Sequence, residues 1–331
     1  MDPSLQATSD QLTQARAQPD AAALAGALLR HANALAAHGQ LAPASIALDE
    51  ALQLQRRRDA RDDVLRCLLL SAELLRLQGR RVEAGERVRE ALAMTAPGTP
   101  DRAQALAVIG QIALSDGDAA GAERSFGEAL AISDQTPAWW HSRARARAAL
   151  GRFDEAAADL QTASDRSAAS NDGAGARRAA IEAATAWHRA RRFDRATALV
   201  AATSAQARAA HDEAALGGLE LLNATAALER HDADAAHVHA QAARTHALAA
   251  RAPETYIGAT LALSRLAEHA NDDVTAYGTL ASGWATLSDL LGADLARAAF
   301  EPVLREQRLR WGAGRFDAAR ASYEVARRAQ S

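Results

Sequence analysis

The stretch "LGRFDEAAADLQTA", Leu150–Ala163, decides the fold, because a near copy, "AGRFDAARASYEVA", stands at Ala313–Ala326. Both copies contain glycine, arginine, phenylalanine and aspartate in succession, followed by alanines at helical spacing. Two versions of one segment so far apart predict an internal repeat. We therefore take Gly151 as a marker and look for its equivalents along the chain.

Equivalents of this marker recur along the whole sequence. They are Gly39, Gly79, Gly117, Gly151, Arg191, His231, Asn271 and Gly314. Counted in residues, the steps between successive equivalents are 40, 38, 34, 40, 40, 40 and 43. A period in this range is typical of stacked helix pairs. Glycine and asparagine at the marker suit a turn with left-handed backbone, as helix ends commonly require.

Three columns of this alignment predict how the helices pack. Five residues after the marker stand only alanines: Ala44, Ala84, Ala122, Ala156, Ala196, Ala236, Ala276 and Ala319. Nine after it stand apolar residues: Leu48, Val88, Phe126, Leu160, Val200, Ala240, Leu280 and Tyr323. Seven before it stand small residues, except in the last copy: Ala32, Ala72, Gly110, Ala144, Ala184, Ala224, Ser264 and Gln307. Antiparallel helices that cross closely need small side chains at the crossing, and a larger residue four positions further on fills the remaining hole.

The repeat resembles the tetratricopeptide-repeat family over residues 21–331. In Ile109–Ile132, the family's signature positions are matched by Ile109, Gly110, Ala122, Phe126 and Ala129; in Trp139–Ala163, they are matched by Trp140, Gly151, Ala156 and Ala163. Only one step equals the family's unit of about 34 residues. The longer steps resemble the helical repeats of bacterial regulator sensor regions and of kinesin light chains.

This resemblance implies an all-α fold, an α-solenoid in which about eight antiparallel helix pairs form a right-handed superhelix. It implies one solenoid over residues 21–331, preceded by a polar segment at residues 1–20 that could form part of a first helix. Composition agrees, since hydrophobic residues make up 49% of the chain and aromatic residues only 4%. Alanine, the best helix former, supplies much of the apolar fraction, and period-two strand patterns are absent.

Charge and hydropathy exclude several classes of protein. All 38 basic residues are arginine, and the net charge of -3 argues against a dedicated nucleic-acid-binding protein. The first residues show no basic-then-apolar signal, and no apolar run reaches the ~18 residues that a membrane span needs. We therefore expect a cytoplasmic protein without membrane insertion.

No catalytic motif is present, so the sequence predicts no enzyme and no cofactor. A chain without lysine has no phosphate-binding GxxxxGK loop, and neither GxSxG nor HExxH occurs. The single cysteine, Cys67, lies on an apolar helical face and is predicted to be a core thiol. The histidines His231, His237, His239 and His246 could suggest a metal site. Helical periodicity favours an ordinary helix face, because residues two apart point in different directions.

The predicted binding surface is a stripe of polar residues six positions before each marker: Asn33, Glu73, Gln111, Arg145, Thr185, Thr225, Arg265 and Arg308. In the family, the first helix of each pair lines the concave face, so the resemblance places this stripe in a groove. Our candidate partner-binding residues are Asn33, Arg66, Gln111, Arg145, Arg178, Arg265, Arg305 and Arg308. The competing interpretation is a solvated face that only keeps the array soluble.

The predicted function is a scaffold or adaptor that binds a protein or peptide segment in this groove. Because arginine forks onto carboxylates, the segment is expected to be acidic. The family's carboxylate clamp is not reproduced, since Leu29 stands where lysine is needed. The alternative is a regulatory domain that senses a small ligand or peptide, for which a closed pocket rather than an open groove is expected. Trp311 is either a groove aromatic or, as we prefer, a cap on the last repeat.

Overall fold

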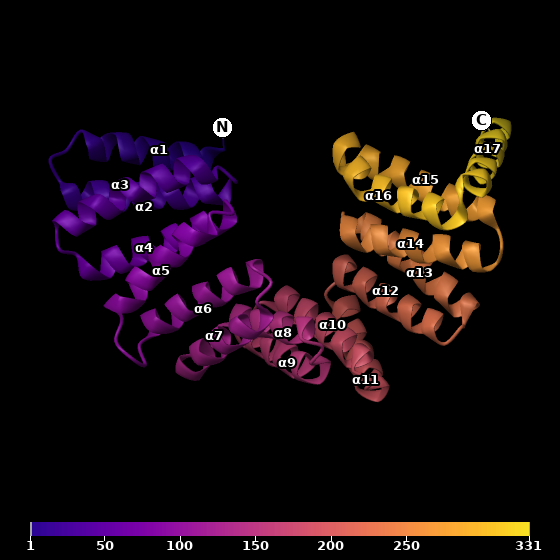
Figure 1. The fold of residues 1–331 in the computed structure, drawn as a ribbon, viewed down its shortest axis with the longest axis horizontal. Coiled ribbons are helices and arrows are strands. Elements are labelled where there is room, and N and C mark those ends of the chain that lie inside the picture. The colour runs from indigo at the N-terminus through magenta and orange to yellow at the C-terminus, as the bar shows by residue number, and fades with distance from the viewer. Residues whose placement is uncertain (1, 331) are drawn as a thin grey trace. The chain divides into compact units, whose positions relative to one another are not determined.

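The computed structural model describes residues 2–330, which contain seventeen α-helices and no strand (Figure 1). Their bounds are α1 Pro3–Arg16, α2 Ala21–Ala37, α3 Leu41–Arg57, α4 Arg61–Leu77, α5 Arg81–Met94, α6 Pro100–Ser115, α7 Ala119–Ile132, α8 Pro137–Ala149, α9 Phe153–Ala169, α10 Gly173–Arg189, α11 Phe193–Ala209, α12 Glu213–Glu229, α13 Ala233–Ala249, α14 Pro253–His269, α15 Asp273–Leu291, α16 Ala293–Trp311 and α17 Ala313–Gln330. The chain divides into two compact units, Met1–Arg166 and Ser167–Ser331.

Helices α2 to α17 form the eight predicted pairs, from α2 with α3 to α16 with α17. The all-α repeat fold is confirmed. A single solenoid over residues 21–331 and its right-handed twist stay predictions. Within the N-terminal segment, residues 3–16 form a helix, α1, which precedes the first repeat helix, α2. Asp2 caps α1 by accepting the amide of Ser4 at 2.8 Å, and Leu5 and Leu12 are buried in the core of the first unit.

The turns repeat as regularly as the helices. Each of the helices α10 to α14 has 17 residues, and short turns of equal length join them. Residues with positive φ, between 51° and 61°, recur at one constant spacing through these turns: Asn171, Arg191, His211, His231, Arg251 and Asn271. The backbone N–H of Arg192 donates a hydrogen bond to the carbonyl oxygen of Trp187 at 2.8 Å, and this contact ends the helix as in a Schellman motif. The predicted left-handed turns are therefore confirmed, and non-glycine residues also adopt them.

The last marker is an exception. The left-handed residue before α17 is Gly312, with φ 77°, whereas Gly314 lies inside the helix. The prediction of Gly314 as the turn residue was therefore wrong by two positions. The preceding helix, α16, extends to Trp311 and is joined to α17 through Gly312 alone, without the longer turn of the earlier pairs.

The alanine column marks the helix crossings, as predicted. All eight of its members are buried, with no more than 4% of any residue exposed. In the third pair, a Cβ added at Gly110 would lie 2.7 Å from the ring of Phe126, which is fully buried. The small residue before the marker and the large one after it are thus in direct contact.

Substitution of Ala156 by leucine is expected to cost about 1–3 kcal/mol of unfolding free energy, because the larger side chain overpacks a closed crossing. Ala158 lies on the same helix but is exposed, so Ala158→Leu is the matched control and should change stability by less than about 0.5 kcal/mol. Urea unfolding of both variants measures the difference. Equal midpoints for the two variants would show that the crossing is not closed.

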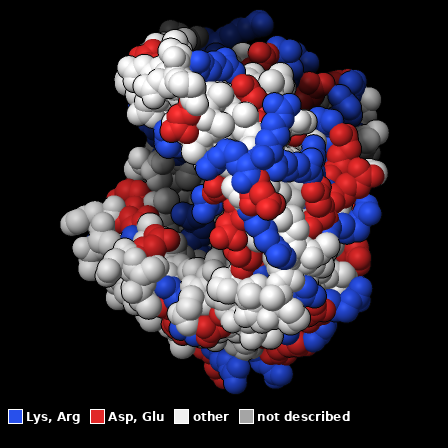
Figure 2. All heavy atoms as spheres, turned by 90° about the vertical axis from the view of Figure 1, so that its left-hand side faces the viewer, with Lys and Arg blue, Asp and Glu red and all other residues white. Residues whose placement is uncertain are grey.

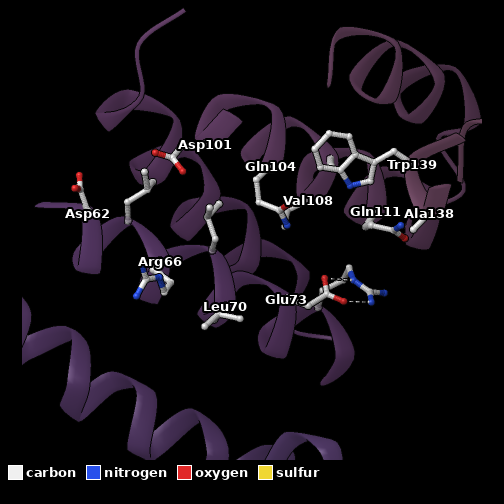
Figure 3. Close-up of a pocket in the computed structure, with 14 residues that line it drawn as sticks. Asp62, Arg66, Leu70, Glu73, Asp101, Gln104, Val108, Gln111, Ala138 and Trp139 are labelled. Carbon is white, nitrogen blue, oxygen red and sulfur yellow. Dashed lines mark hydrogen bonds and ion pairs between the residues drawn. The ribbon is translucent and has the colours of Figure 1, made fainter. Parts of the chain in front are cut away.

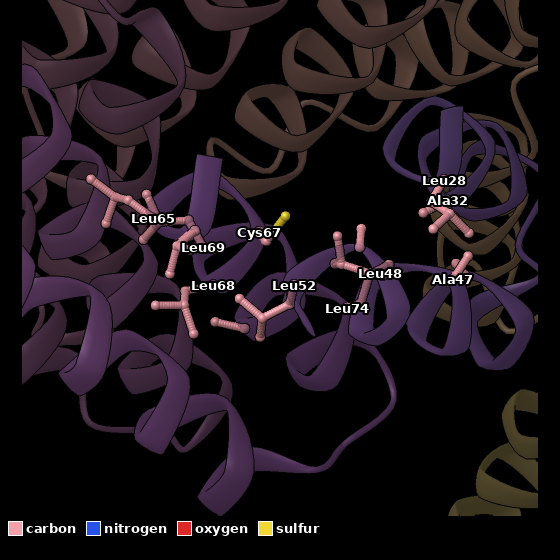
Figure 4. Close-up of a cluster of buried hydrophobic side chains, with 14 of the residues drawn as sticks. Leu28, Ala32, Ala47, Leu48, Leu52, Leu65, Cys67, Leu68, Leu69 and Leu74 are labelled. Carbon is pink, nitrogen blue, oxygen red and sulfur yellow. The ribbon is translucent and has the colours of Figure 1, made fainter. Parts of the chain in front are cut away.

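The core of the first unit is a cluster of leucines and alanines between α2, α3 and α4 (Figure 4). Leu28, Leu48 and Leu68 are almost completely inaccessible, and Cys67 lies among them. Burial raises the pKa of the Cys67 thiol to about 11, so the group is protonated at neutral pH. The prediction of a core thiol is confirmed.

Trp311 closes the last repeat of the second unit. It is buried and packs with Phe316 and Ala276, and its indole N–H donates to Oε1 of Glu268 at 2.6 Å. Arg315 lies 4.8 Å above the ring. These contacts occupy both the ring and its polar edge, so Trp311 is a packing residue and not a groove aromatic.

Ion pairs link neighbouring helices on the surface of the first unit. Arg56 on α3 contacts Glu90 on α5 at 2.5 Å, and Arg87 on α5 contacts Asp49 on α3 at 3.1 Å. Figure 2 shows basic and acidic side chains interleaved over the face that lies on the left of Figure 1. Exposed pairs of this kind contribute little stability each, but they leave this face without a large excess of either charge.

Candidate functional site

A pocket of about 860 Å³ lies in the first unit, between α4, α6 and α8 (Figure 3). These three are the first helices of the second, third and fourth pairs. The resemblance predicted that first helices would line the binding face. The pocket is therefore the candidate site.

The pocket forms because α8 is short and its first turn lies beside a later part of α6, not beside the first turn of α6. Nε2 of Gln111, in the last third of α6, donates to Oγ of Ser142, near the middle of α8, at 2.8 Å. Since the first helices run in the same direction, α8 covers the second half of α6 and leaves the first half open. The cause is visible in the sequence, because the step from Gly117 to Gly151 is the shortest in the array.

The pocket has an apolar floor and a polar rim. Leu65, Leu69 and Val108 form buried parts of its lining, and the half-buried ring of Trp139 adds an aromatic wall. The pocket is open to solvent along its rim, where the exposed residues are Asp62, Arg66, Asp101, Gln104 and Ala138. The indole N–H of Trp139 has no hydrogen-bond partner within residues 2–330. A partner could therefore bury apolar atoms and still find polar groups at the edge.

The two arginines of the pocket are already engaged. Glu73 accepts two hydrogen bonds from Arg76, at 2.9 Å from Nε and 2.5 Å from Nη2, and this contact raises the pKa of Arg76. Arg66 lies 3.4 Å from Oδ1 of Asp63, which is outside the pocket. Both guanidinium groups thus contact a carboxylate of the chain, Arg76 through two hydrogen bonds and Arg66 through one long contact.

Two carboxylates of the pocket have no such partner. Asp62 and Asp101 make no hydrogen bond or ion pair in the described part of the chain. Each lies in the first turn of its helix, α4 or α6, where the positive end of the helix dipole favours a negative charge. The unpaired charges that line the pocket are therefore negative.

The predicted site residues are divided between the pocket and other surfaces. Arg66 and Gln111 line the pocket. Asn33 on α2 and Arg145 on α8 are exposed in the same unit but do not line it. The lining residues that the sequence did not predict include Asp62, Asp101, Gln104 and Trp139.

The remaining candidates lie in the second unit. Arg305 contacts Glu301 at 2.9 Å and Arg308 contacts Asp317 at 3.2 Å, so both guanidinium groups are paired within their own repeat. The exposed arginines Arg178 on α10 and Arg265 on α14 have no ion pair within residues 2–330. The stripe itself is as predicted in one respect, since none of its eight positions is buried.

A buried charge cluster on the other side of α8 was also not predicted. The carboxylate of Asp159 on α9 accepts from Nε and Nη2 of Arg143 at 2.9 and 2.7 Å, and Arg147 reaches it at 2.9 Å. Arg147 also contacts Glu123 on α7 at 2.9 Å. Only 4% of the Asp159 side chain is exposed. This cluster holds α8 against α7 and α9, and so fixes the helix that carries Trp139.

The histidines noted in the sequence lie along α13 and its preceding turn. His239 contacts Glu220 and His246 contacts Glu213, both at 2.6 Å, and both carboxylates belong to α12. His231 has the left-handed backbone of the turn. The two contacts hold the packed helices α12 and α13 together.

Comparison with known proteins shows the fold. No protein-family model matches the sequence, and no curated protein matches it. BtubC (BKLC) from P. vanneervenii matches with a TM-score of 0.55 and 20% identity, over 63% of this chain and 91% of that one. A tetratricopeptide repeat protein from Parabacteroides merdae matches with a TM-score of 0.55 and 12% identity, over 84% of this chain and 97% of that one. This chain has the fold of a tetratricopeptide-repeat protein.

The same tetratricopeptide-repeat fold relates the chain to yeast Tom70, with a TM-score of 0.51 and 15% identity, over 87% of this chain and 61% of that one. The resemblance inferred from the repeat columns is thus confirmed at the level of the fold. Across residues 2–330, no helix combines the length and the apolar character that crossing a bilayer requires.

Proposed function

We propose that this chain is a protein-interaction scaffold that binds an extended protein or peptide segment in the pocket between α4, α6 and α8. The observation that supports this proposal is an open pocket of about 860 Å³ with a buried apolar floor and an exposed polar rim. Three successive first helices contribute to it, so a bound segment crosses several repeats. Such a site suits a chain that lies across the helices.

The polar groups of the pocket suit a peptide backbone. The side-chain amide of Gln104 has no hydrogen-bond partner among residues 2–330 and offers both a donor and an acceptor. Gln111 uses an amide hydrogen on Ser142 and keeps its carbonyl oxygen for another donor. A sensor of small molecules, the alternative function, favours an enclosed cavity, and the exposed rim supports the scaffold instead.

Replacing Gln104 by tryptophan is expected to fill the pocket and abolish binding without disturbing the core, because Gln104 is exposed. Peptides are first selected on the immobilised full chain from a random dodecapeptide library displayed on phage. Their affinities are then measured for the parent, for Gln104→Trp and for a control, Gln53→Trp, which alters an exposed glutamine on α3 outside the pocket. A loss of at least about tenfold is expected for Gln104→Trp alone, the equivalent of ~1.4 kcal/mol. Selected peptides that bind all three proteins equally would refute the proposal.

An acidic partner for the arginines of the second unit stays part of the proposed function. Support comes from Arg178 and Arg265, which are exposed and have no ion pair in the described part of the chain. Arg305 and Arg308 support this proposal less strongly, because each is paired with a carboxylate of its own repeat. Acidic peptides from the same selection that lose affinity for Arg265→Glu, but not for Arg305→Glu, would support this second surface.

A further inference from the structure

We propose that the segment bound between α4, α6 and α8 carries an arginine or lysine side chain close to an apolar one. This inference rests on the proposed function and names the chemistry of the partner at that site. It reverses the charge that the sequence predicted for the partner, because the free charges of this pocket are carboxylates.

Both arginines that line the pocket already contact carboxylates of the chain. Of the groups that line the pocket, Arg76 is held by Glu73 through two hydrogen bonds, and Arg66 lies 3.4 Å from Asp63. An acidic partner would have to compete with these internal carboxylates for either guanidinium group. Arg76 therefore offers an acidic side chain little that is not already used, and Arg66 offers a guanidinium group that Asp63 shares.

The unpaired charges are those of Asp62 and Asp101. Both are exposed, and both line the pocket from the first turn of neighbouring parallel helices. A cationic side chain placed at this end of the pocket meets two carboxylates from two different helices. Charge-assisted hydrogen bonds to carboxylates are roughly twice as strong as neutral ones. An acidic side chain at the same place meets like charge from both aspartates, and Arg66, which Figure 3 shows toward this end, is already in contact with Asp63.

The apolar part of the partner follows from what lies beside these carboxylates. Figure 3 shows Asp62 and Asp101 toward one end of the pocket, and Trp139 with Gln111 toward the other. The floor owes its apolar character to leucines of α4 and to Val108 of α6. A segment whose cationic group reaches the two aspartates therefore runs over leucine and valine toward the indole ring. An apolar or aromatic side chain on the partner buries its surface there.

The test uses the peptides selected on the full chain and a pair of isosteric variants. Asp62→Asn/Asp101→Asn removes both charges and keeps the size of the side chains. The control, Asp194→Asn/Asp234→Asn, makes the same change in net charge at two exposed aspartates, each also in the first turn of its helix. Arginine or lysine should be enriched in peptides whose binding depends on Gln104. Those peptides should bind the Asp62→Asn/Asp101→Asn protein about five- to tenfold more weakly and the control protein as well as the parent.

The outcomes separate the two proposals. Selected peptides that need an open pocket, by the Gln104→Trp criterion, but carry no basic residue or bind the double asparagine variant normally, would overturn this inference and leave the scaffold function standing. Peptides whose binding ignores Gln104→Trp would overturn the proposed function itself. Peptides enriched in aspartate and glutamate at this pocket would show that the partner is acidic after all.

Discussion

Asp159→Asn is expected to lower the free energy of unfolding of the first unit by about 3–5 kcal/mol. The carboxylate is 4% exposed and receives three hydrogen bonds or ion contacts from Arg143 and Arg147, whose side chains are 15% and 17% exposed. An asparagine of the same shape leaves two guanidinium groups in a confined space without their shared negative charge. Breaking a buried ion pair on one side is costly because the remaining charge has lost its compensation, and here this applies to Arg143, since Arg147 keeps Glu123.

A matched control and a rescue variant make this result specific. Asp165 lies on the same helix, is exposed and has no ion pair in the described part of the chain, so Asp165→Asn should change stability by less than about 0.5 kcal/mol. Arg143→Met/Asp159→Leu removes the carboxylate together with Arg143, while Arg147 keeps its contact with Glu123, and it should recover part of the loss because Arg143 no longer lacks a counter-charge. Urea unfolding of the full chain, followed by tryptophan fluorescence, measures all three. A midpoint for Asp159→Asn equal to that of Asp165→Asn would show that the cluster does not stabilise α8.

Phe126→Ala is expected to destabilise the first unit by about 3–5 kcal/mol. The ring is completely buried between α6, α7 and α8, in a cluster that also includes Leu106, Ala122 and Ala146. Removing it leaves a cavity that rigid helices fill poorly. Phe193→Ala is the comparison: that residue is 44% exposed, so the substitution should cost no more than about 1 kcal/mol.

Gly110 provides a second, independent check on this contact. A Cβ at Gly110 would lie 2.7–2.9 Å from three atoms of the Phe126 ring, so Gly110→Ala alone is expected to destabilise by about 1–3 kcal/mol. With Phe126→Ala present, the same methyl group enters empty space and replaces a flexible helical glycine, and it should stabilise by about 0.5–1 kcal/mol. A change of sign in the double-mutant cycle is thus the expected result. Additive effects of the two substitutions would mean that the glycine and the ring do not touch.

The sequence predicted the packing of this protein better than its polar contacts. The alanine columns are informative because a crossing of two helices restricts side-chain size at one position per repeat, and eight copies reinforce the pattern. The pairing of Arg143 with Asp159 has no such pattern, since it occurs in one repeat only. Helical periodicity gives the face on which a residue lies, but it does not say which of several arginines reaches a carboxylate on another helix.

The pocket was partly predictable for the same reason. Glu73 and Gln111 of the polar stripe line the pocket, and so does Arg66, which was assigned to the same side. Asp62, Asp101 and Trp139 were missed because they belong to the first turns of their helices, away from the aligned columns. The short step before Gly151 was the available signal: it shortens one pair, and the offset between α6 and α8 follows from it.

The left-handed turns that recur at one constant spacing between Asn171 and Asn271 restrict how this part of the chain can change in length. Successive helices alternate between the two layers of the array. Loss or gain of a single helix and its turn would therefore exchange the layers for everything that follows, placing solvent-facing residues where alanines must cross. Loss or gain of two helices with their turns would leave every later helix in its own layer, with an equivalent turn at each junction. Duplication and deletion are thus tolerated here in steps of two helices, which makes the pair, and not the helix, the unit by which such a protein can evolve or be engineered.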